Sequence, residues 1–165
     1  MERIGFGGSC HWCTEAIFQS LIGVEKVEQG WISSADEHLE FSEAVVVSYE
    51  PIAVSLETLI EVHLYTHSCT SRHSMRTKYR SAVYFTSDGQ GRESAAVIGD
   101  LQIHFSDTII TQVLPLIAFK LNSNEYLNYY YDNPQKPFCK NIVHPKLKVL
   151  LAKFSSFVDR NKLQD

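Results

Sequence analysis

The sequence predicts a single α/β domain of the α+β kind, in which helices cover a mixed β-sheet. Two observations lead to this fold class. Apolar segments typical of strands alternate along the whole chain with segments whose apolar residues have helical spacing. The 165 residues, of which 44% are hydrophobic, are enough for one core and too few to divide comfortably into two. Residues 1–165 are therefore expected to form one domain, without repeats or linkers.

Three strands and two helices are expected in the first half of the chain. Arg3–Gly8 has the pattern of a short strand that ends in glycines, and Thr14–Leu21 has apolar residues at helical spacing. Val24–Trp31 and Phe41–Tyr49 are expected strands, and the second contains an unbroken apolar run that fits a buried position in a sheet. Ser55–His67 is an expected helix with one apolar face and a serine placed as its cap.

The second half continues the alternation. Arg80–Phe85 has a strand pattern, and a turn then starts a helical segment over residues 88–105. Thr108–Leu114 is an expected strand closed by a proline, and residues 123–131 are an expected short aromatic helix that an Asn-Pro pair ends. Pro145–Val158 has helical spacing, with its proline acceptable in a first turn.

The charge pattern argues against two classes of partner. The 15 Lys and Arg against 19 Asp and Glu give a net charge of -4 without a run of like charges, so neither a nucleic acid nor a membrane surface is an expected partner. The N-terminus lacks a signal-peptide pattern, and no apolar stretch approaches the roughly 18 residues that a membrane span needs. We expect a monomeric, cytoplasmic protein.

Cys10 is the residue most suited to chemistry. It lies where the first strand changes to the first helix, and the unpaired amides at a helix start lower the pKa of a thiol there. The preceding glycines let another molecule approach the backbone, and Trp12 offers an apolar face beside the sulfur. A plain glycine turn with a packed tryptophan explains these features equally well.

Cys10 also forms a Cys-x-x-Cys pair with Cys13, which leaves two other interpretations open. In a thioredoxin-like disulfide exchanger, Cys13 would resolve a mixed disulfide formed at Cys10. In a zinc site, the pair would need distant ligands, and only His67 and Cys69 come near a second close pair, so we expect no metal.

The motifs around these residues resemble the A-class peptide methionine sulfoxide reductases. Phe6 to Glu15 is similar to the family's Gly-Cys-Phe-Trp-Gly-x-Glu signature, with Cys10, Trp12 and Glu15 in place. Further similar segments follow in order over nearly the whole chain: Gly23-Val24 to Gly30-Trp31, Glu43-Ala44-Val45, Tyr49-Glu50-Pro51, Thr77-Lys78-Tyr79-Arg80-Ser81, Tyr129 to Pro134, Phe138-Cys139, Val143 and Pro145-Lys146-Leu147.

The resemblance implies a two-layer sandwich with a ferredoxin-like core, and reduction of the S epimer of methionine sulfoxide, free or in proteins. A sulfoxide sulfur is a poor target until its oxygen is protonated or strongly hydrogen-bonded, so the Cys10 thiolate needs an acid nearby. We assign that role to Glu43, because burial in an apolar strand disfavours the charged carboxylate and keeps a proton available. The alternative is a glutamate on the solvent face of an edge strand.

Tyr129 matches the family's tyrosine that hydrogen-bonds the sulfoxide oxygen, although a helical tyrosine often only packs. Trp12 would hold the substrate's methyl group. His11 takes the place of a phenylalanine in that pocket, which makes the pocket more polar and pH-sensitive. Glu15 and Asn124, which stands where the family has an aspartate, complete the expected substrate-binding residues. Ser42 replaces a histidine, and the shortened loop after Trp31 lacks the second sulfoxide-binding tyrosine.

After attack, a second thiol must condense with the Cys10 sulfenic acid to form a disulfide. Cys139 lies where the family commonly places this resolving cysteine and is preferred, while Cys13 is close enough in sequence to do the same. No cofactor is expected, and a thioredoxin-like dithiol would restore the enzyme. Cys69 is interpreted as a bystander. A third hypothesis is a non-catalytic module that binds oxidised methionine without turning it over.

Overall fold

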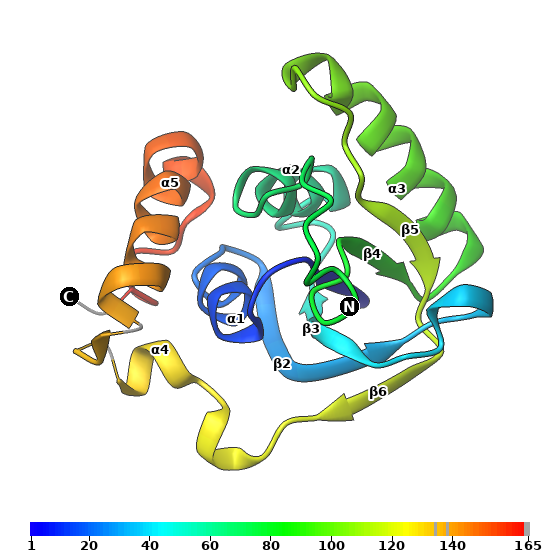
Figure 1. Ribbon diagram of the computed structural model, residues 1–165. Helices are drawn as coiled ribbons and strands as arrows, with labels where there is room; N and C mark the ends of the chain where they lie inside the picture. The colour runs from blue at the N-terminus through cyan, green and yellow to red at the C-terminus, as the bar shows by residue number, and fades with distance from the viewer. Residues whose placement is uncertain (134, 138, 164–165) are drawn as a thin grey trace.

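The computed structural model describes residues 1–133, 135–137 and 139–163, and it contains one six-stranded sheet flanked by helices (Figure 1). The strand order is β5-β4-β1-β3-β2-β6, with β4 and β5 parallel and the other neighbours antiparallel. The predicted mixed sheet covered by helices is therefore confirmed. The strands are β1 (Glu2–Gly7), β2 (Val24–Ser33), β3 (Ser42–Tyr49), β4 (Ala82–Phe85), β5 (Gln112–Pro115) and β6 (Ala118–Leu121). The helices are α1 (His11–Gln19), α2 (Leu56–Tyr65), α3 (Asp88–Leu101), α4 (Tyr129–Asp132) and α5 (His144–Phe154).

Strand β3 is the centre of the sheet, and its position explains its composition. It pairs with β1 on one side and with β2 on the other, and all of its residues are buried. A strand with neighbours on both edges and covered faces has no solvent side, so its apolar residues need not alternate with polar ones. Glu43 is thus carried into the interior by a central strand.

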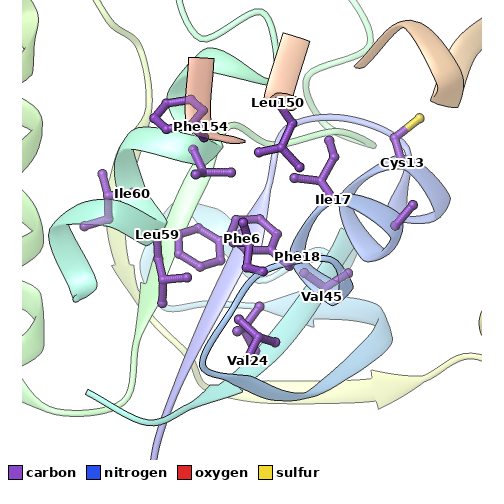
Figure 2. Packing of buried hydrophobic residues seen from close by; sticks show 14 of the residues in the cluster. Phe6, Cys13, Ile17, Phe18, Val24, Val45, Leu59, Ile60, Leu150 and Phe154 are labelled. Atoms are coloured by element: carbon purple, nitrogen blue, oxygen red, sulfur yellow. The ribbon is translucent and has the colours of Figure 1, made fainter. Parts of the chain in front are cut away.

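The main core lies between the sheet and helices α1, α2 and α5, which gather on one face (Figure 1). Phe6 of β1 stacks on Phe18 of α1 with 4.5 Å between ring centroids, and Leu59 and Leu150 close the cluster from α2 and α5 (Figure 2). Successive strand residues point to opposite faces. The alternate set forms a smaller cluster on the other face: Ile32, Ala44, Val46, Ala82 and Tyr84.

Several predicted elements differ from the structure in their bounds. The strand expected over 108–114 is confined to Gln112–Pro115, and the last helix ends at Phe154, where a 3-10 turn follows. The aromatic helix is two pieces, a 3-10 turn at Asn124–Tyr126 and α4, because Asn128 adopts a left-handed conformation with φ of 54° that a helix cannot include.

Strand β6 was not predicted. Its four residues carry too little pattern to identify a strand, and they become one by pairing with β2, Gly30 opposite Leu121 and Ser33 opposite Ala118. A side chain at Gly30 would bring a Cβ within 2.1 Å of the Lys120 carbonyl oxygen, so the glycine permits this pairing. No helix in the described part of the chain is long and apolar enough to span a membrane.

Candidate active site

The loop between β1 and α1 presents Cys10 to solvent. Gly8 has a φ of 142°, and a Cβ there would lie 2.5 Å from the ring of His67, so only glycine fits. Cys10 follows as the N-cap of α1, and its side chain is half-buried without a capping hydrogen bond. The sequence therefore places a thiol at the positive end of a helix, as predicted.

Cys10 is also activated by its neighbours. The thiol of Cys13 hydrogen-bonds the Cys10 sulfur, and this contact lowers the pKa of Cys10. Burial opposes the shift, while the backbone amides of Cys13 and Trp12 add to it. The same contact raises the pKa of Cys13, so the pair divides into a thiolate at Cys10 and a thiol at Cys13.

The side chains of His63 and Arg76 hold the loop before Cys10 in place. The carbonyl of Gly7 accepts from His63 Nε2 at 2.8 Å, and burial lowers the pKa of His63 to about 3, so this ring donates as a neutral imidazole. The carbonyl of Gly8 accepts from Arg76 Nη1 at 2.8 Å, and the same nitrogen donates to the Tyr79 carbonyl at 2.9 Å. The loop and the segment around Tyr79 are thereby tied together.

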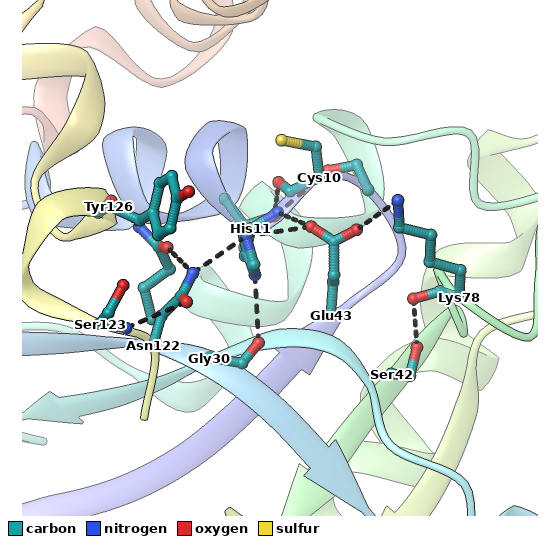
Figure 3. Close-up of polar contacts among 12 residues, drawn as sticks. Cys10, His11, Gly30, Ser42, Glu43, Lys78, Asn122, Ser123 and Tyr126 are labelled. Carbon is teal, nitrogen blue, oxygen red and sulfur yellow. Dashed lines mark hydrogen bonds and ion pairs between the residues drawn. The ribbon is translucent and has the colours of Figure 1, made fainter. Parts of the chain in front are cut away.

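Glu43 lies beside Cys10 at the start of β3 and is only 4% exposed. Its Oε1 accepts from the His11 amide at 3.3 Å and lies 3.2 Å from His11 Nε2, and its Oε2 is 3.6 Å from Lys78 Nζ (Figure 3). Ser42 Oγ donates to the Lys78 carbonyl at 2.8 Å, which keeps the lysine segment against β3. A glutamate on the solvent face of an edge strand is therefore excluded.

Cys10 and Glu43 open onto one shared cavity of about 360 Å³. This volume is in the range of small-ligand pockets, which combine apolar walls with a few polar groups. Its lining residues are Cys10, His11, Trp12, Trp31, Glu43, Lys78, Tyr79, Asn122 and Tyr126. The structure thus brings together four of the predicted site residues, the nucleophile, the acid and the two pocket residues next to the nucleophile.

The comparisons with known proteins agree with this site. The family model described as peptide methionine sulfoxide reductase matches residues 2–157. The chain is 31% identical over 163 residues to the peptide methionine sulfoxide reductase MsrA of Pasteurella multocida, covering 90% of this chain and 94% of that protein. It is 32% identical over 161 residues to the MsrA of Ruthia magnifica, covering 89% and 96%.

The chain belongs to the peptide methionine sulfoxide reductase family.

Solved structures show that it also has the fold of this family. The reduced form of Mxr1 from Saccharomyces cerevisiae superposes with a TM-score of 0.74 at 21% identity, covering 84% of this chain and 88% of that one. Methionine sulfoxide reductase A of Corynebacterium diphtheriae superposes with a TM-score of 0.72 at 22% identity, covering 82% and 76%. The family recognised in the sequence is confirmed, and with it the class of enzyme.

Among the predicted site residues that do not line the cavity are Tyr129 and Asn124. The ring of Tyr129 stacks flat on Trp12, with 4.0 Å between centroids, and the cavity is lined instead by Tyr126. Asn124 lies in the preceding 3-10 turn, while Asn122 at the end of β6 reaches the cavity and hydrogen-bonds His11. The left-handed Asn128 separates Tyr126 from Tyr129 along the chain, and the roles assigned to Tyr129 and Asn124 from the sequence stay predictions.

Three further residues that line the cavity of this reductase were not among the site residues predicted from the sequence. Trp31 comes from β2 and meets the His11 ring edge-on at 5.3 Å. Lys78 and Tyr79 come from the segment before β4. All three lie inside motifs that resemble the family, so the motifs contained the signal, but their orientation toward the cavity depends on the pairing of distant strands.

Glu15 stabilises a segment next to the reductase site. It is 1% exposed, and its carboxylate accepts from the amides of Asn128 at 2.9 Å and Tyr129 at 3.1 Å. Burial raises the pKa of Glu15, and these two amides oppose the rise. Glu15 is not among the described residues that line the cavity, so its contacts are those of a group that fixes the tyrosine segment against α1.

Replacing Glu15 with alanine is therefore expected to lower the free energy of unfolding by about 2–4 kcal/mol, because two buried amides lose their acceptor. Urea unfolding followed by tryptophan fluorescence measures the change. Glu93→Ala is the matched control, since Glu93 is exposed in the middle of α3, and its effect should stay within about 0.5 kcal/mol. An equal decrease in the free energy of unfolding in both variants would contradict this role of Glu15.

The remaining cysteines of the reductase are buried. Cys13 and Cys139 belong to the main core cluster, and both interact electrostatically with Cys10. Cys69 is also buried in the core and is free, as are the other three. Among the described residues, no group of three or more His, Cys, Asp or Glu side chains is arranged to hold a metal ion. Pro134 and Phe138, which take part in the sequence resemblance, lie outside the described residues.

Proposed function

We propose that this protein reduces methionine S-sulfoxide to methionine, with Cys10 as the nucleophile and Glu43 as the acid. The observation that carries the proposal is that a thiol with a lowered pKa and a buried carboxyl open onto one cavity. Membership of the peptide methionine sulfoxide reductase family supports the same reaction. The two groups supply what a sulfoxide requires, an attacking sulfur and a proton for the oxygen.

The proposed first step forms a bond between the Cys10 sulfur and the sulfoxide sulfur while the sulfoxide oxygen takes one proton from the acid. The oxygen then passes to Cys10 as a hydroxyl, and methionine leaves. Cys10 is oxidised by two electrons to a sulfenic acid, and the sulfoxide is reduced by two electrons to a thioether.

The walls of the cavity favour a thioether-derived substrate. Trp12, Trp31 and Tyr126 present aromatic surface, which suits the methyl group and the methylenes of methionine sulfoxide. The acid and the nucleophile stand at fixed places in this cavity, so the sulfoxide oxygen must point toward Glu43 when the sulfur faces Cys10. Only one arrangement of methyl group, side chain and oxygen satisfies both, which is why we propose selectivity for one epimer.

Two cysteines are candidates for the resolving step, and we propose Cys13. Its thiol already hydrogen-bonds the Cys10 sulfur, whereas Cys139, preferred from the sequence, has only an electrostatic interaction with Cys10 among the described contacts. Condensation of the Cys13 thiol with the Cys10 sulfenic acid forms a disulfide and releases water. A thioredoxin-like dithiol then reduces the disulfide. A solved structure of yeast Mxr1 in complex with Trx2, at 21% identity and a TM-score of 0.60, supports this kind of partner.

Cys13→Ser is expected to leave the sulfenic acid at Cys10 unresolved after one turnover, and to lower steady-state turnover with thioredoxin by about 10-fold or more. Serine keeps a hydroxyl that can hydrogen-bond the Cys10 sulfur, so the first step should persist. Mass spectrometry after trapping with dimedone measures the sulfenic acid. Cys139→Ser is the matched variant and should form the Cys10–Cys13 disulfide normally. Trapped sulfenic acid in Cys139→Ser and none in Cys13→Ser would assign the step to Cys139.

The experiment that tests the function uses the reduced protein with each epimer of a peptide-bound and a free methionine sulfoxide, and measures methionine release with dithiol present. Turnover of the S epimer alone is expected. Reduction of insulin disulfides without sulfoxide turnover would support a Cys-x-x-Cys exchanger instead. Sulfoxide binding without turnover would support a non-catalytic binding module.

The proposed function also agrees with a ferredoxin-like core in a two-layer sandwich. The strands β4-β1-β3-β2 are antiparallel neighbours in that order, and they are connected along the chain as β1-α1-β2-β3-α2-β4. This is the connection pattern of ferredoxin-like domains. It places the loop after β1 next to the start of β3, and hence Cys10 next to Glu43.

A further inference from the structure

A chain of hydrogen bonds determines the protonation of His11, the residue that stands where the family has a phenylalanine. Gln29 Nε2 donates to the Tyr126 carbonyl at 2.8 Å, so Gln29 Oε1 accepts from Asn122 Nδ2 at 2.8 Å. Asn122 Oδ1 accepts from the Ser123 amide at 3.0 Å, which fixes the orientation of this side chain. Asn122 Nδ2 is then 3.3 Å from His11 Nε2. An amide nitrogen only donates, so His11 Nε2 must accept.

The other ring nitrogen of His11 agrees with this assignment. Nδ1 lies 3.2 Å from the carbonyl oxygen of Gly30, which only accepts, so Nδ1 carries the hydrogen. Burial lowers the pKa of His11, although the carboxylate of Glu43 opposes the effect, and a lowered pKa favours the neutral ring. His11 is thus a neutral imidazole whose Nε2 presents a lone pair.

The lone pair of His11 Nε2 faces the catalytic carboxyl. Glu43 Oε1 is 3.2 Å from Nε2, and both side chains are nearly fully buried. A carboxylate at this distance from an accepting nitrogen would repel it in a buried site, so the contact requires a proton on Glu43, which Nε2 accepts on the same lone pair as the Asn122 hydrogen. We infer that His11 and Glu43 jointly hold one proton, and that this is the proton delivered to the sulfoxide oxygen. This inference rests on the function proposed above. His11 is then a positioning residue that acts through Glu43.

Four other titratable side chains line this cavity. Lys78 Nζ lies 3.6 Å from Glu43 Oε2 and its side chain is 49% exposed, and its positive charge favours the ionised carboxylate. Cys10, Tyr79 and Tyr126 complete the titratable groups. An acceptor at Nε2 favours the protonated carboxyl, in opposition to Lys78. Without His11, the carboxyl loses the partner that shares its proton.

The proton balance of the reaction follows. The pair gives its one proton to the sulfoxide oxygen when Cys10 attacks as a thiolate, and the transferred oxygen carries that proton into the sulfenic acid. His11 and Glu43 remain as a neutral imidazole and a carboxylate. A proton from water through the open cavity restores the pair before the next turnover. No oxidant or reductant is needed beyond the sulfoxide and the thiol.

The first test measures the protonation of the His11 ring directly and does not depend on activity. Ring ¹⁵N NMR of the protein, which has seven histidines, locates His11 by the signal that disappears in His11→Gln. We expect Nδ1 to be protonated and the Nε2 signal to lie between the accepting and the protonated positions at neutral pH. In Glu43→Gln the Nε2 signal should return to the accepting position, and the pKa of His11 should fall because the carboxylate that raises it is gone.

The second test is the pH dependence of sulfoxide turnover in His11→Gln. Glutamine can hydrogen-bond but cannot take up a proton, so the alkaline fall of kcat should move to lower pH by about one unit. At neutral pH kcat should fall by about 10-fold, with KM changed less than about threefold. His104→Gln, an exposed histidine outside the cavity, is the matched control and should leave the profile unchanged.

The outcomes separate this inference from the proposed function. An Nε2–H tautomer in the wild-type protein, or an Nε2 signal that Glu43→Gln does not move, overturns the shared proton whether or not the protein is active. An unshifted pH profile in His11→Gln overturns its part in the reaction. Absence of sulfoxide turnover in the wild-type protein overturns the function, while the NMR result still decides whether the pair exists.

Discussion

Replacing Cys10 with serine is expected to lower kcat for sulfoxide reduction by about 10⁴-fold or more, because a hydroxyl at this position cannot replace the thiolate as nucleophile. The hydrogen bond from the Cys13 thiol and the backbone amides of Trp12 and Cys13 stabilise a negative charge on the Cys10 sulfur. A serine hydroxyl, in contrast, stays protonated near neutral pH. Methionine release from the S-sulfoxide, measured in single and multiple turnover, gives the result.

Two further measurements make the Cys10 result specific. Cys69→Ala removes a buried cysteine outside the cavity and should keep the wild-type rate. Binding of the S-sulfoxide to Cys10→Ser, followed by tryptophan fluorescence, should persist, because Trp12 and Trp31 still form the pocket. Turnover by Cys10→Ser at the rate of the wild-type protein would overturn the assignment of the nucleophile.

The second large effect is expected at Glu43. Glu43→Gln should lower kcat by about 10²–10⁴-fold, since an amide keeps the shape of the carboxyl but cannot supply a proton. KM should change little, because the aromatic walls are untouched.

The thiol should remain reactive in Glu43→Gln. A negative charge on Glu43 raises the pKa of Cys10, so its removal cannot make the thiolate harder to form. Alkylation of Cys10 by iodoacetamide at neutral pH should be at least as fast as in the wild-type protein. Glu40→Gln, an exposed neighbour in the loop before β3, is the control. Unchanged kcat in Glu43→Gln would show that the proton comes from elsewhere.

The strongest predictions from the sequence concern features determined by neighbours along the chain. The position of Cys10 at a helix start follows from the glycines before it and the apolar spacing after it. The burial of β3 follows from its unbroken apolar run, which requires neighbours on both sides. Ordered motifs over the whole chain identified the family, because a motif keeps the residue types that the chemistry needs.

The sequence was least informative where distant segments meet. Strand β6 was missed because a four-residue segment becomes a strand only through the partner it finds in β2. Tyr129 and Asn124 were assigned from the family resemblance, whereas Tyr126 and Asn122 line the cavity. A left-handed residue at Asn128 separates the two tyrosines, and no propensity makes that conformation evident in advance.

By itself, the sequence determined the fold class and the family and predicted the nucleophile and the acid, because each depends on residue type and local pattern. Only the tertiary structure decided that His11 contacts Glu43, that Asn122 orients His11, and that the Cys13 thiol contacts Cys10. These contacts join residues from different strands or depend on side-chain directions. The same side chain therefore packs, donates or holds a proton according to the partner that the fold brings within hydrogen-bond distance.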